Sequence, residues 1–144
     1  MLVRQILTSK SDDGVVTLAP GTTVGSVAET LSRRRIGAVV ISRDGKTVLG
    51  IVSERDVVRE LGRRGAACLT DSVDGMMTAS VVTCTRHDSA DDVLQKMTDG
   101  RFRHLPVVEA GQMVGLISIG DVVKARLAEL NMEKDALEGM IKGF

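Results

Sequence analysis

A glycine, two apolar residues, a serine and, three residues after the serine, an aspartate occur as one pattern twice in this sequence. The two segments are Gly50–Asp56, which contains Ser53, and Gly115–Asp121, which contains Ser118. Where a helix begins, such a serine and carboxylate cap the free backbone N–H groups of the first turn. The same groups also suit an anion, and the carboxylate suits the two hydroxyls of a ribose. Both interpretations stay open, because a duplicated fold also duplicates its helix caps.

A dense group of basic side chains stands directly at the start of an apolar run in the second half of the chain, and the first half has no equivalent at the corresponding positions. Counted 66 positions apart (101 minus 35), the segment 101–104 (Arg-Phe-Arg-His) corresponds to 35–38 (Arg-Ile-Gly-Ala). Guanidinium groups bind phosphates through paired hydrogen bonds, so the second half of the chain is predicted to hold the stronger phosphate site. In the first half of the chain, the guanidinium of Arg55 is expected to compensate in part for the missing basic side chains. The alternative for Arg101 and Arg103 is a solvated surface.

The histidines and cysteines do not form a pattern typical of a metal site. Cys68 and Cys84 have no C-x-x-C spacing and are expected to be small buried side chains without a disulfide. The chain has two histidines, of which His87 is expected in a surface loop. No metal site is therefore predicted. His104 acting as a base beside Asp121 is the one catalytic alternative, and the sequence offers it no second catalytic group.

Composition argues against several classes of partner. Of the 144 residues, 43% are hydrophobic and 26% are charged, which is ordinary for a folded domain. The 19 basic and 19 acidic residues cancel, so no overall field attracts a nucleic acid or an anionic membrane. With no Trp, no Tyr and two Phe, the chain offers bases little to stack on. The sequence also lacks an apolar run of transmembrane length and a signal peptide, so a cytoplasmic location is expected.

An internal repeat organises the chain. The matching segments are 50–58 with 115–123, 15–17 with 81–83, and 3–8 with 73–78, at offsets of 65, 66 and 70 (115 minus 50, 81 minus 15, 73 minus 3). Self-similarity of this kind indicates two copies of one structural unit. Each copy predicts the same order of elements, namely strand, helix, strand, strand and helix, with the first strands at 15–17 and 81–83.

The periodicity of apolar residues places these elements. Spacings of i, i+3, i+4 and i+7 predict one amphipathic helix after Thr22 or Thr23 and another after Asp88 or Ser89. Short apolar runs separated by a glycine-containing turn predict a hairpin in each copy. The predicted hairpin strands are 38–41, 48–52, 105–108 and 113–117, and a further helix is expected to start at Ser53 and at Ser118.

The predicted fold class is α/β of the α+β kind, with two β-α-β-β-α repeats packed as one pseudo-two-fold module. A single copy of about 60 residues is a marginal core by itself. We expect the first repeat at 3–62, the second at 73–130 and a C-terminal helical extension at 131–144, with a polar surface loop at 11–14. The apolar stripe of the last helix (Val123, Leu127, Leu130, Leu137 and Ile141) needs cover from the N-terminal segment or from a second subunit.

Taken together, these features resemble the CBS domains, a family named after cystathionine β-synthase that occurs as tandem pairs. The resemblance covers 3–130. It rests on both copies of the G-h-h-S-x-x-D signature, on Met77-Thr78 ahead of 81–83, and on the segment 102–108 (Phe-Arg-His-Leu-Pro-Val-Val). It implies a regulatory protein that is not an enzyme and whose clefts bind an adenine nucleotide, AMP or ATP, or else NAD(H).

The resemblance also implies roles for individual residues. The signature aspartate contacts the ribose, the serine lies near the phosphates, the first-strand threonine lines the adenine slot, and the start of the hairpin closes it. One cleft is expected to contain Thr83, Arg101, Arg103, His104, Pro106, Ser118 and Asp121. The other is expected to contain Thr17, Ala38, Ser53, Arg55 and Asp56. Val40 stands where the second copy has Pro106, so unequal occupancy of the clefts is expected.

The expected function is a stand-alone sensor of adenosine-containing ligands that signals to a regulated protein partner through a shift in conformation. A two-fold homodimer like the disk-shaped modules of the family is expected, with no nucleic acid or membrane partner. Two alternatives come from other classes: an interaction or scaffold protein with degenerate pockets, and a small nucleotide hydrolase that uses His104 and Asp121. A ligand-dependent rise in melting temperature favours the sensor over the scaffold, and nucleotide turnover favours the hydrolase.

Overall fold

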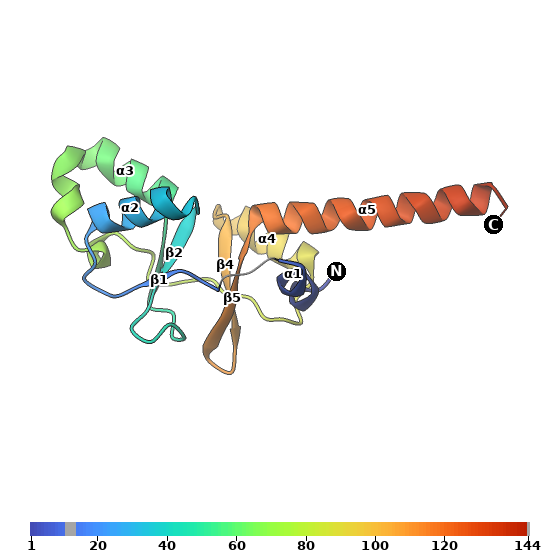
Figure 1. Cartoon of the computed structure of the whole chain (residues 1–144), viewed down its shortest axis with the longest axis horizontal. Helices are drawn as coiled ribbons and strands as arrows, with labels where there is room; N and C mark the ends of the chain where they lie inside the picture. Colours follow the sequence, from blue (N-terminus) through green and yellow to red (C-terminus); the bar gives the residue numbers. More distant parts are fainter. Residues whose placement is uncertain (11–13, 144) are drawn as a thin grey trace.

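The order helix, strand, strand, helix occurs once in each half of the chain, and the computed structural model describes residues 1–10 and 14–143. The elements are α1 (Val3–Ser9), β1 (Thr17–Leu18), α2 (Val24–Arg34), β2 (Ala38–Ile41), β3 (Gly50–Ser53), α3 (Glu54–Arg64), the 3₁₀ turns η1 (Gly65–Thr70) and η2 (Val73–Gly75), α4 (Ala90–Gly100), β4 (His104–Glu109), β5 (Gln112–Ser118) and α5 (Ile119–Ile141) (Figure 1). The α+β class is confirmed. The loop expected at 11–14 falls largely on residues 11–13, which lie outside the described residues.

The first helix of each repeat starts and stops in the same way. Thr23 caps α2 by accepting the N–H of Ser26 at 3.1 Å, and Ser89 caps α4 by accepting the N–H of Asp92 at 3.0 Å. Both helices end on an arginine in the left-handed conformation, with φ of 54° at Arg35 and 57° at Arg101. These two arginines are repeat equivalents, so the chain turns identically before β2 and before β4.

The strand predicted at 81–83 is wrong. In the first repeat β1 is parallel to β2, and the N–H of Val40 donates to the carbonyl of Val16 at 3.3 Å. The repeat equivalent of Val40 is Pro106, which has no N–H to donate. Pairing in the second repeat is therefore reduced to a single parallel bridge between Cys84 and Val107, and the sheet there is the antiparallel β4–β5 hairpin alone.

Two hydrophobic cores form, and each includes a segment that belongs by sequence to the other repeat. Val3 and Ile6 of α1 are buried in the core formed by α4, β4, β5 and the start of α5. Val73 of η2 is buried in the core formed by α2, β2, β3 and α3. We call 3–10 and 73–78 the exchanged segments, because each crosses to the opposite repeat.

The signature glycines are explained by these crossings. A β-carbon at Gly50 would collide with the side chain of Met77, and a β-carbon at Gly115 would lie 2.9 Å from Cδ2 of Leu7. The two contacts are repeat equivalents, at offsets of 65 (115 minus 50) and 70 (77 minus 7). Each glycine thus admits an exchanged segment against the last strand of the opposite repeat.

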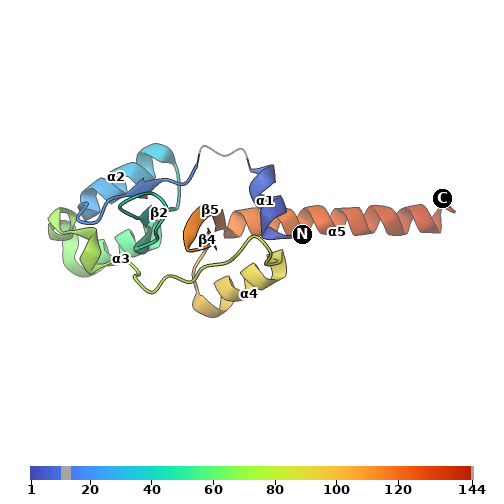
Figure 2. The ribbon, with the colours of Figure 1, turned by 90° about the horizontal axis from the view of Figure 1, so that it is seen from below.

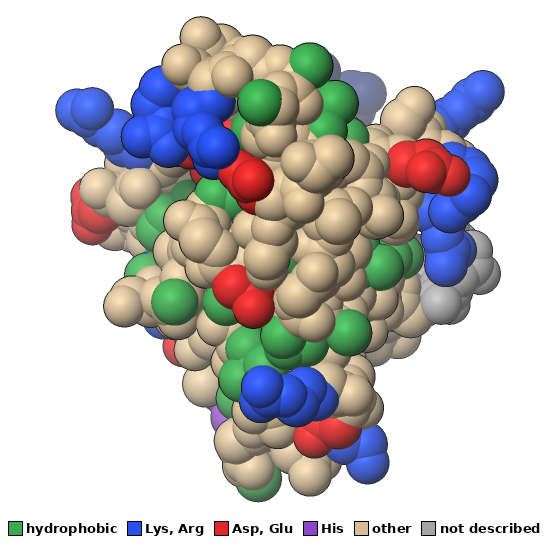
Figure 3. All heavy atoms as spheres, turned by 90° about the vertical axis from the view of Figure 1, so that its left-hand side faces the viewer, with side chains coloured by type: hydrophobic (Ala, Val, Ile, Leu, Met, Phe, Trp, Pro, Cys, Tyr) green, Lys and Arg blue, Asp and Glu red, His purple; other side chains and the backbone are tan. Residues whose placement is uncertain are grey.

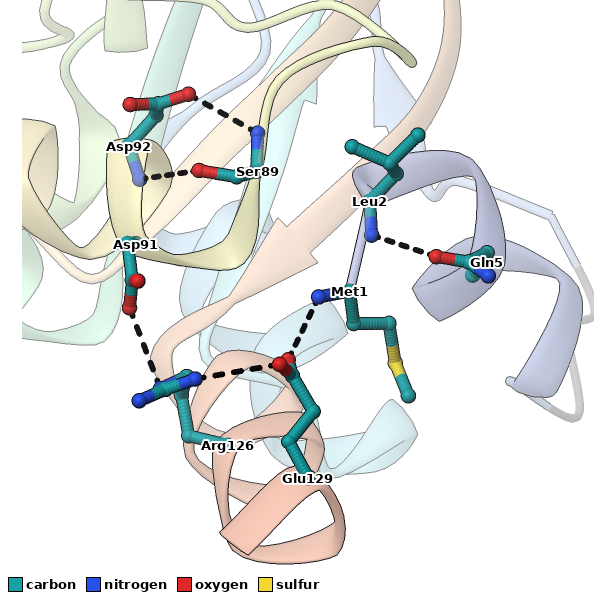
Figure 4. A network of polar contacts seen from close by, with 8 residues as sticks. All are labelled: Met1, Leu2, Gln5, Ser89, Asp91, Asp92, Arg126 and Glu129. Carbon is teal, nitrogen blue, oxygen red and sulfur yellow. Dashed lines mark hydrogen bonds and ion pairs between the residues drawn. The ribbon is translucent and has the colours of Figure 1, made fainter. Parts of the chain in front are cut away.

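The last helix overruns the second repeat, as predicted, and projects far from the body of the molecule (Figures 1 and 2). Its 23 residues give a length of about 35 Å. α1 covers part of its first turns, and the N-terminal ammonium of Met1 binds Oε1 of Glu129 at 2.7 Å (Figure 4). The apolar stripe remains exposed, from 46% at Val123 to 85% at Ile141. The N-terminal segment therefore covers the first turns of α5 and leaves its apolar stripe exposed to solvent.

The outer end of the first repeat shows no single basic face. In Figure 3, Lys and Arg side chains lie in separate groups with acidic side chains beside them. Hydrophobic side chains on this face are scattered in small groups. This end of the molecule therefore presents a mixed surface.

Candidate functional site

Each signature serine and aspartate forms a closed capping box. Oδ2 of Asp56 accepts the N–H of Ser53 at 2.8 Å, and the hydroxyl of Ser53 accepts the N–H of Asp56 at 3.3 Å. In the second repeat the corresponding distances, between Ser118 and Asp121, are 2.9 and 3.2 Å. The capping interpretation is confirmed for both copies.

A first cavity, of about 480 Å³, opens beside the capping box of α3. The first repeat contributes Gly37, Ala38, Ile51, Ser53, Glu54, Arg55, Asp56 and Arg59. The second repeat contributes Thr78, Ser80, Val81, Val82, Gly100, Arg101, Phe102, Arg103 and His104. We call it the first cleft. Both repeats build it, and its volume lies in the range of small-molecule sites.

A second cavity, of about 410 Å³, lies beside the capping box of α5 and is called the second cleft. Its lining comprises Lys10, Gly14, Val15, Val16, Arg34, Ile36, Gly37, Ala38, His104, Leu116 and Ser118. Most of these residues are repeat equivalents of first-cleft residues. Ser118 corresponds to Ser53 and Leu116 to Ile51. Lys10 corresponds to Ser80 at the offset of 70 (80 minus 10). The two clefts are therefore related by the pseudo-two-fold symmetry of the repeats.

The structure groups the site residues differently from the sequence-based expectation. Arg101 and Arg103 were expected beside Asp121, and they line the first cleft together with Asp56. The reason is that the starts of β2 and β4 meet at the boundary between the repeats. A β-carbon at Gly37 would lie 3.0 Å from Cε1 of His104. Residues just before β4 therefore reach the capping box of the opposite repeat, and the stronger guanidinium cluster belongs to the first cleft.

The other expected residues are distributed as follows. Ala38, Ser53 and Arg55 line the first cleft as grouped, and Ser118 lines the second. Thr17, Thr83, Pro106 and Asp121 are not among the residues that line either cavity. Thr17 pairs with Val40 in the sheet, and Pro106 is buried in β4. The carbonyl of Thr83 accepts a hydrogen bond from Nζ of Lys96 at 2.9 Å.

His104 and its repeat equivalent Ala38 form a wall common to both clefts. Burial lowers the pKa of His104, and Lys10 and Arg103 lower it further, whereas the charges of Glu54 and Asp121 oppose the shift. The imidazole is therefore mostly neutral near pH 7. A neutral ring at this wall contributes shape and a hydrogen-bonding group to each cleft.

The charges of the two clefts differ. The first cleft contains four guanidinium groups, from Arg55, Arg59, Arg101 and Arg103, against the carboxylates of Glu54 and Asp56. Among the residues that line the second cleft, the cationic side chains are Lys10 and Arg34. Beside this cleft, Nζ of Lys10 lies 2.9 Å from Oδ2 of Asp121. The first cleft is thus the better equipped for a polyanion.

Sequence reasoning missed several lining residues. Lys10 and Ser80 stand just beyond the matched segments 3–8 and 73–78, and the same offset of 70 would have aligned them. Val15, Val16, Val81 and Val82 were identified as strand residues, and the structure also places them in the cavity walls. For Arg34 and Phe102 no signal in the sequence distinguished a wall position from helix end or core.

Comparison with known proteins identifies the family of this chain. The CBS domain family matches residues 3–63 and 73–128. This chain belongs to the CBS domain family. A CBS-domain containing protein from Agrobacterium tumefaciens of known structure is 47% identical with a TM-score of 0.83, covering 88% of this chain and 99% of its own. A CBS domain protein from Pyrobaculum aerophilum, complexed with AMP, is 27% identical with a TM-score of 0.77, covering 92% and 99%.

Curated relatives are longer than this chain. A mitochondrial CBS domain-containing protein from Arabidopsis thaliana is 33% identical over 125 residues, which is 84% of this chain and 61% of the relative. Two further Arabidopsis relatives are matched over 23% and 22% of their lengths. The CBS pair is therefore also a module within larger proteins.

Two absences concern the described part of the chain. Across residues 1–10 and 14–143, no three His, Cys, Asp or Glu side chains gather in a group able to hold a metal ion. Within the same residues, every helix is too short or too polar to cross a membrane.

Proposed function

We propose that the first cleft of this CBS pair binds an adenosine-containing ligand that carries phosphate, and that occupancy of the cleft is a regulatory signal. The observation that supports this most strongly is the meeting of Asp56 with Arg101 and Arg103 in one cavity. The carboxylate suits a ribose and the guanidinium groups suit phosphate. The homologue complexed with AMP supports the same ligand class.

The capping role of Asp56 is compatible with ribose binding. An ionised carboxylate offers about four acceptor sites. Oδ2 of Asp56 serves Ser53, and Oδ1 lies 3.4 Å from Nη1 of the exposed Arg59. The cap therefore holds the carboxylate in place while leaving acceptor capacity for ribose hydroxyls.

A ligand in the first cleft would contact both repeats at once. Its ribose side would meet the first repeat at Asp56, and its phosphate side would meet the second repeat at Arg103. Such a ligand binds one relative orientation of the repeats more tightly and shifts the population toward it, with a coupling of about 1 to 3 kcal/mol. This shift is the signal we propose for a regulated protein partner.

A homodimer forms part of the proposal. Val58 on α3 and Val123 on α5 are repeat equivalents (123 minus 58 is 65), and 67% and 46% of their surfaces are exposed. Leu127, one turn along α5, is 57% exposed. Two equivalent apolar positions on one protomer suit a two-fold partner, which covers both with the same contacts. We therefore propose that a second copy covers α3 and the first half of α5.

Calorimetric titration with AMP, ATP and NAD tests the ligand class, alongside mass spectrometry of small molecules released from gently purified protein. Saturable binding of AMP without turnover supports the sensor. If none of the three ligands binds or raises the melting temperature, the sensor proposal is wrong and a scaffold protein is favoured. Hydrolysis of a bound nucleotide by the pure protein would instead establish the hydrolase alternative.

A further inference from the structure

The ammonium of Lys10, which lines the second cleft, is paired with Asp121, the signature carboxylate beside that cleft. Its Nζ lies 2.9 Å from Oδ2 of Asp121 and donates to the carbonyl of Leu116 at 2.8 Å. The same Oδ2 accepts the N–H of Ser118, so one oxygen carries the cap and the ammonium together. The Lys10 and Asp121 side chains are only 30% and 20% exposed, so solvent screens the pair incompletely. The carboxylate that the family resemblance implies as a ribose contact is thus already paired with a cation.

The first cleft has no equivalent of this pair. At the position of Lys10 it has Ser80, and the carbonyl of Ile51 accepts the main-chain N–H of Thr78 at 3.0 Å instead of an ammonium. The cation nearest to Asp56 is Arg59 of the same helix, 3.4 Å away and 70% exposed. Lys10 therefore distinguishes the second cleft from the first at the signature carboxylate, whose oxygens would accept the ribose hydroxyls.

We propose that Lys10 is a specificity-determining residue that restricts the second cleft to phosphorylated adenosine ligands. The inference rests on the proposed function and extends it to the second cleft, because it assumes that Asp121, the repeat equivalent of Asp56 beside that cleft, meets a ribose in the same way. A ligand that takes a share of this carboxylate loosens the ammonium of Lys10. The ammonium then needs another anion within the cleft, because the carbonyl of Leu116 alone does not compensate its charge.

A phosphate supplies that anion, and a neutral nucleoside does not. With AMP the ammonium moves from carboxylate to phosphate, and the number of ion pairs is conserved. With adenosine the ribose competes with Lys10 for Asp121 and nothing replaces the lost pair. Lys10 and Arg103 both lie close enough to lower the pKa of His104, so this boundary already carries two cations and an uncompensated ammonium there is disfavoured. Discrimination between the two ligands therefore comes from Lys10 itself.

A purely structural role makes a different prediction. Lys10 follows α1 and ties this exchanged segment to the edge of β5 through Leu116. If that were its whole role, loss of the ammonium would loosen the cleft wall and weaken every ligand alike. The ratio of AMP affinity to adenosine affinity separates the two roles.

The test is a titration of the full chain with AMP and with adenosine, followed by amide NMR. The N–H of Ser118 reports the second cleft and the N–H of Ser53 reports the first, because each donates to its own signature carboxylate. In Lys10→Met we expect AMP affinity at the Ser118 reporter to fall about tenfold or more. Adenosine affinity there should rise about two- to fivefold, since the competing ion pair is gone.

Two further variants complete the test. Lys10→Arg retains the cation and should retain the preference for AMP. Lys96→Met is the matched control, because Lys96 also donates to a carbonyl and lies near an aspartate, Asp88, yet lines neither cleft. It should leave the affinity ratio unchanged.

Equal weakening of both ligands by Lys10→Met, or no change in either, would overturn the assignment. If neither ligand shifts either reporter in the unmodified protein, the proposed function itself fails, and the role of Lys10 fails with it. The ion pair has a ligand-free check: the lowered pKa of Asp121, which the bonds from Ser118 and Lys10 hold down against the effect of burial, should rise in Lys10→Met.

Discussion

Asp56→Asn separates ligand binding from helix capping in the first cleft. The substitution removes the negative charge and keeps an oxygen that can accept the N–H of Ser53, now 2.8 Å from Oδ2. The cap therefore survives in its main hydrogen bond. A ribose loses the charged acceptor that makes its hydroxyl bonds strong.

The two effects differ in size. Loss of charge in the first turn of α3 should lower the free energy of unfolding by about 0.3 to 1 kcal/mol. Loss of charged hydrogen bonds to the ribose should weaken binding by about 1.5 to 3 kcal/mol, which is about tenfold to a hundredfold in affinity. At a ligand concentration of about 100 times the original Kd, ligand stabilisation should fall from about 2.7 to about 0.9 kcal/mol for a thirtyfold loss.

Thermal unfolding with and without AMP measures both quantities in one experiment, and calorimetry gives the affinity directly. The matched control is Asp92→Asn. Asp92 forms the same capping box with Ser89 at the start of α4, at 3.1 and 3.0 Å, and lines neither cleft. It should lower the melting temperature slightly and leave AMP affinity unchanged. A destabilised Asp56→Asn protein with full AMP affinity would refute the ribose assignment and leave Asp56 as a helix cap.

Three further predictions follow from the same geometry. Arg103→Ala should weaken the binding of AMP but not of adenosine in calorimetric titration, and the affected site should be the one that Asp56→Asn weakens. Weaker AMP binding at the other site would instead support the sequence-based prediction that Arg103 belongs with Asp121. Because burial lowers the pKa of His104 below its usual 6.5, the unfolded chain binds more protons than the folded chain. The free energy of unfolding should therefore fall as the pH drops below about 7, and His104→Gln should flatten this slope in denaturant titrations. Val58→Glu should turn a dimer into a monomer in light scattering, and a wild-type monomer at micromolar concentration would contradict the proposed interface.

The offsets between the two repeats predicted most of the helices and strands correctly. Local signals were strong where a position has one dominant role: Thr23 and Ser89 start helices because their hydroxyls accept first-turn N–H groups, and both hairpins follow from apolar runs with glycine turns. The missing strand at 81–83 shows the limit of alignment by repeat. Similar valines stand in both copies, and the difference lies in the partner strand, where Pro106 cannot donate.

The site was harder to predict than the fold, because its residues meet across the boundary between the repeats. Sequence order placed Arg103 with Asp121 of its own repeat, whereas the structure brings it to Asp56. Nothing local to Arg103 encodes which repeat it approaches. The pairing of Lys10 was missed for a related reason: its partner Asp121 is 111 positions away (121 minus 10), and only the fold brings the end of α1 to the start of α5.

The exchanged segments constrain how such a chain could have arisen and how it can be cut. In a protein that consists of one repeat, the exchanged segment would have no opposite core to pack against. The core of that repeat would also lack the buried side chain that Val3 or Val73 contributes from the other repeat. Two such proteins would complete both cores if each packed its exchanged segment into the core of the other. The ancestor before duplication is therefore best described as a domain-swapped dimer. Fusion of the two genes of such a dimer would keep both exchanged segments within one chain. For engineering, a single repeat excised at its sequence boundaries should fail to fold, whereas separate fragments divided near 64–72 should reassemble when mixed.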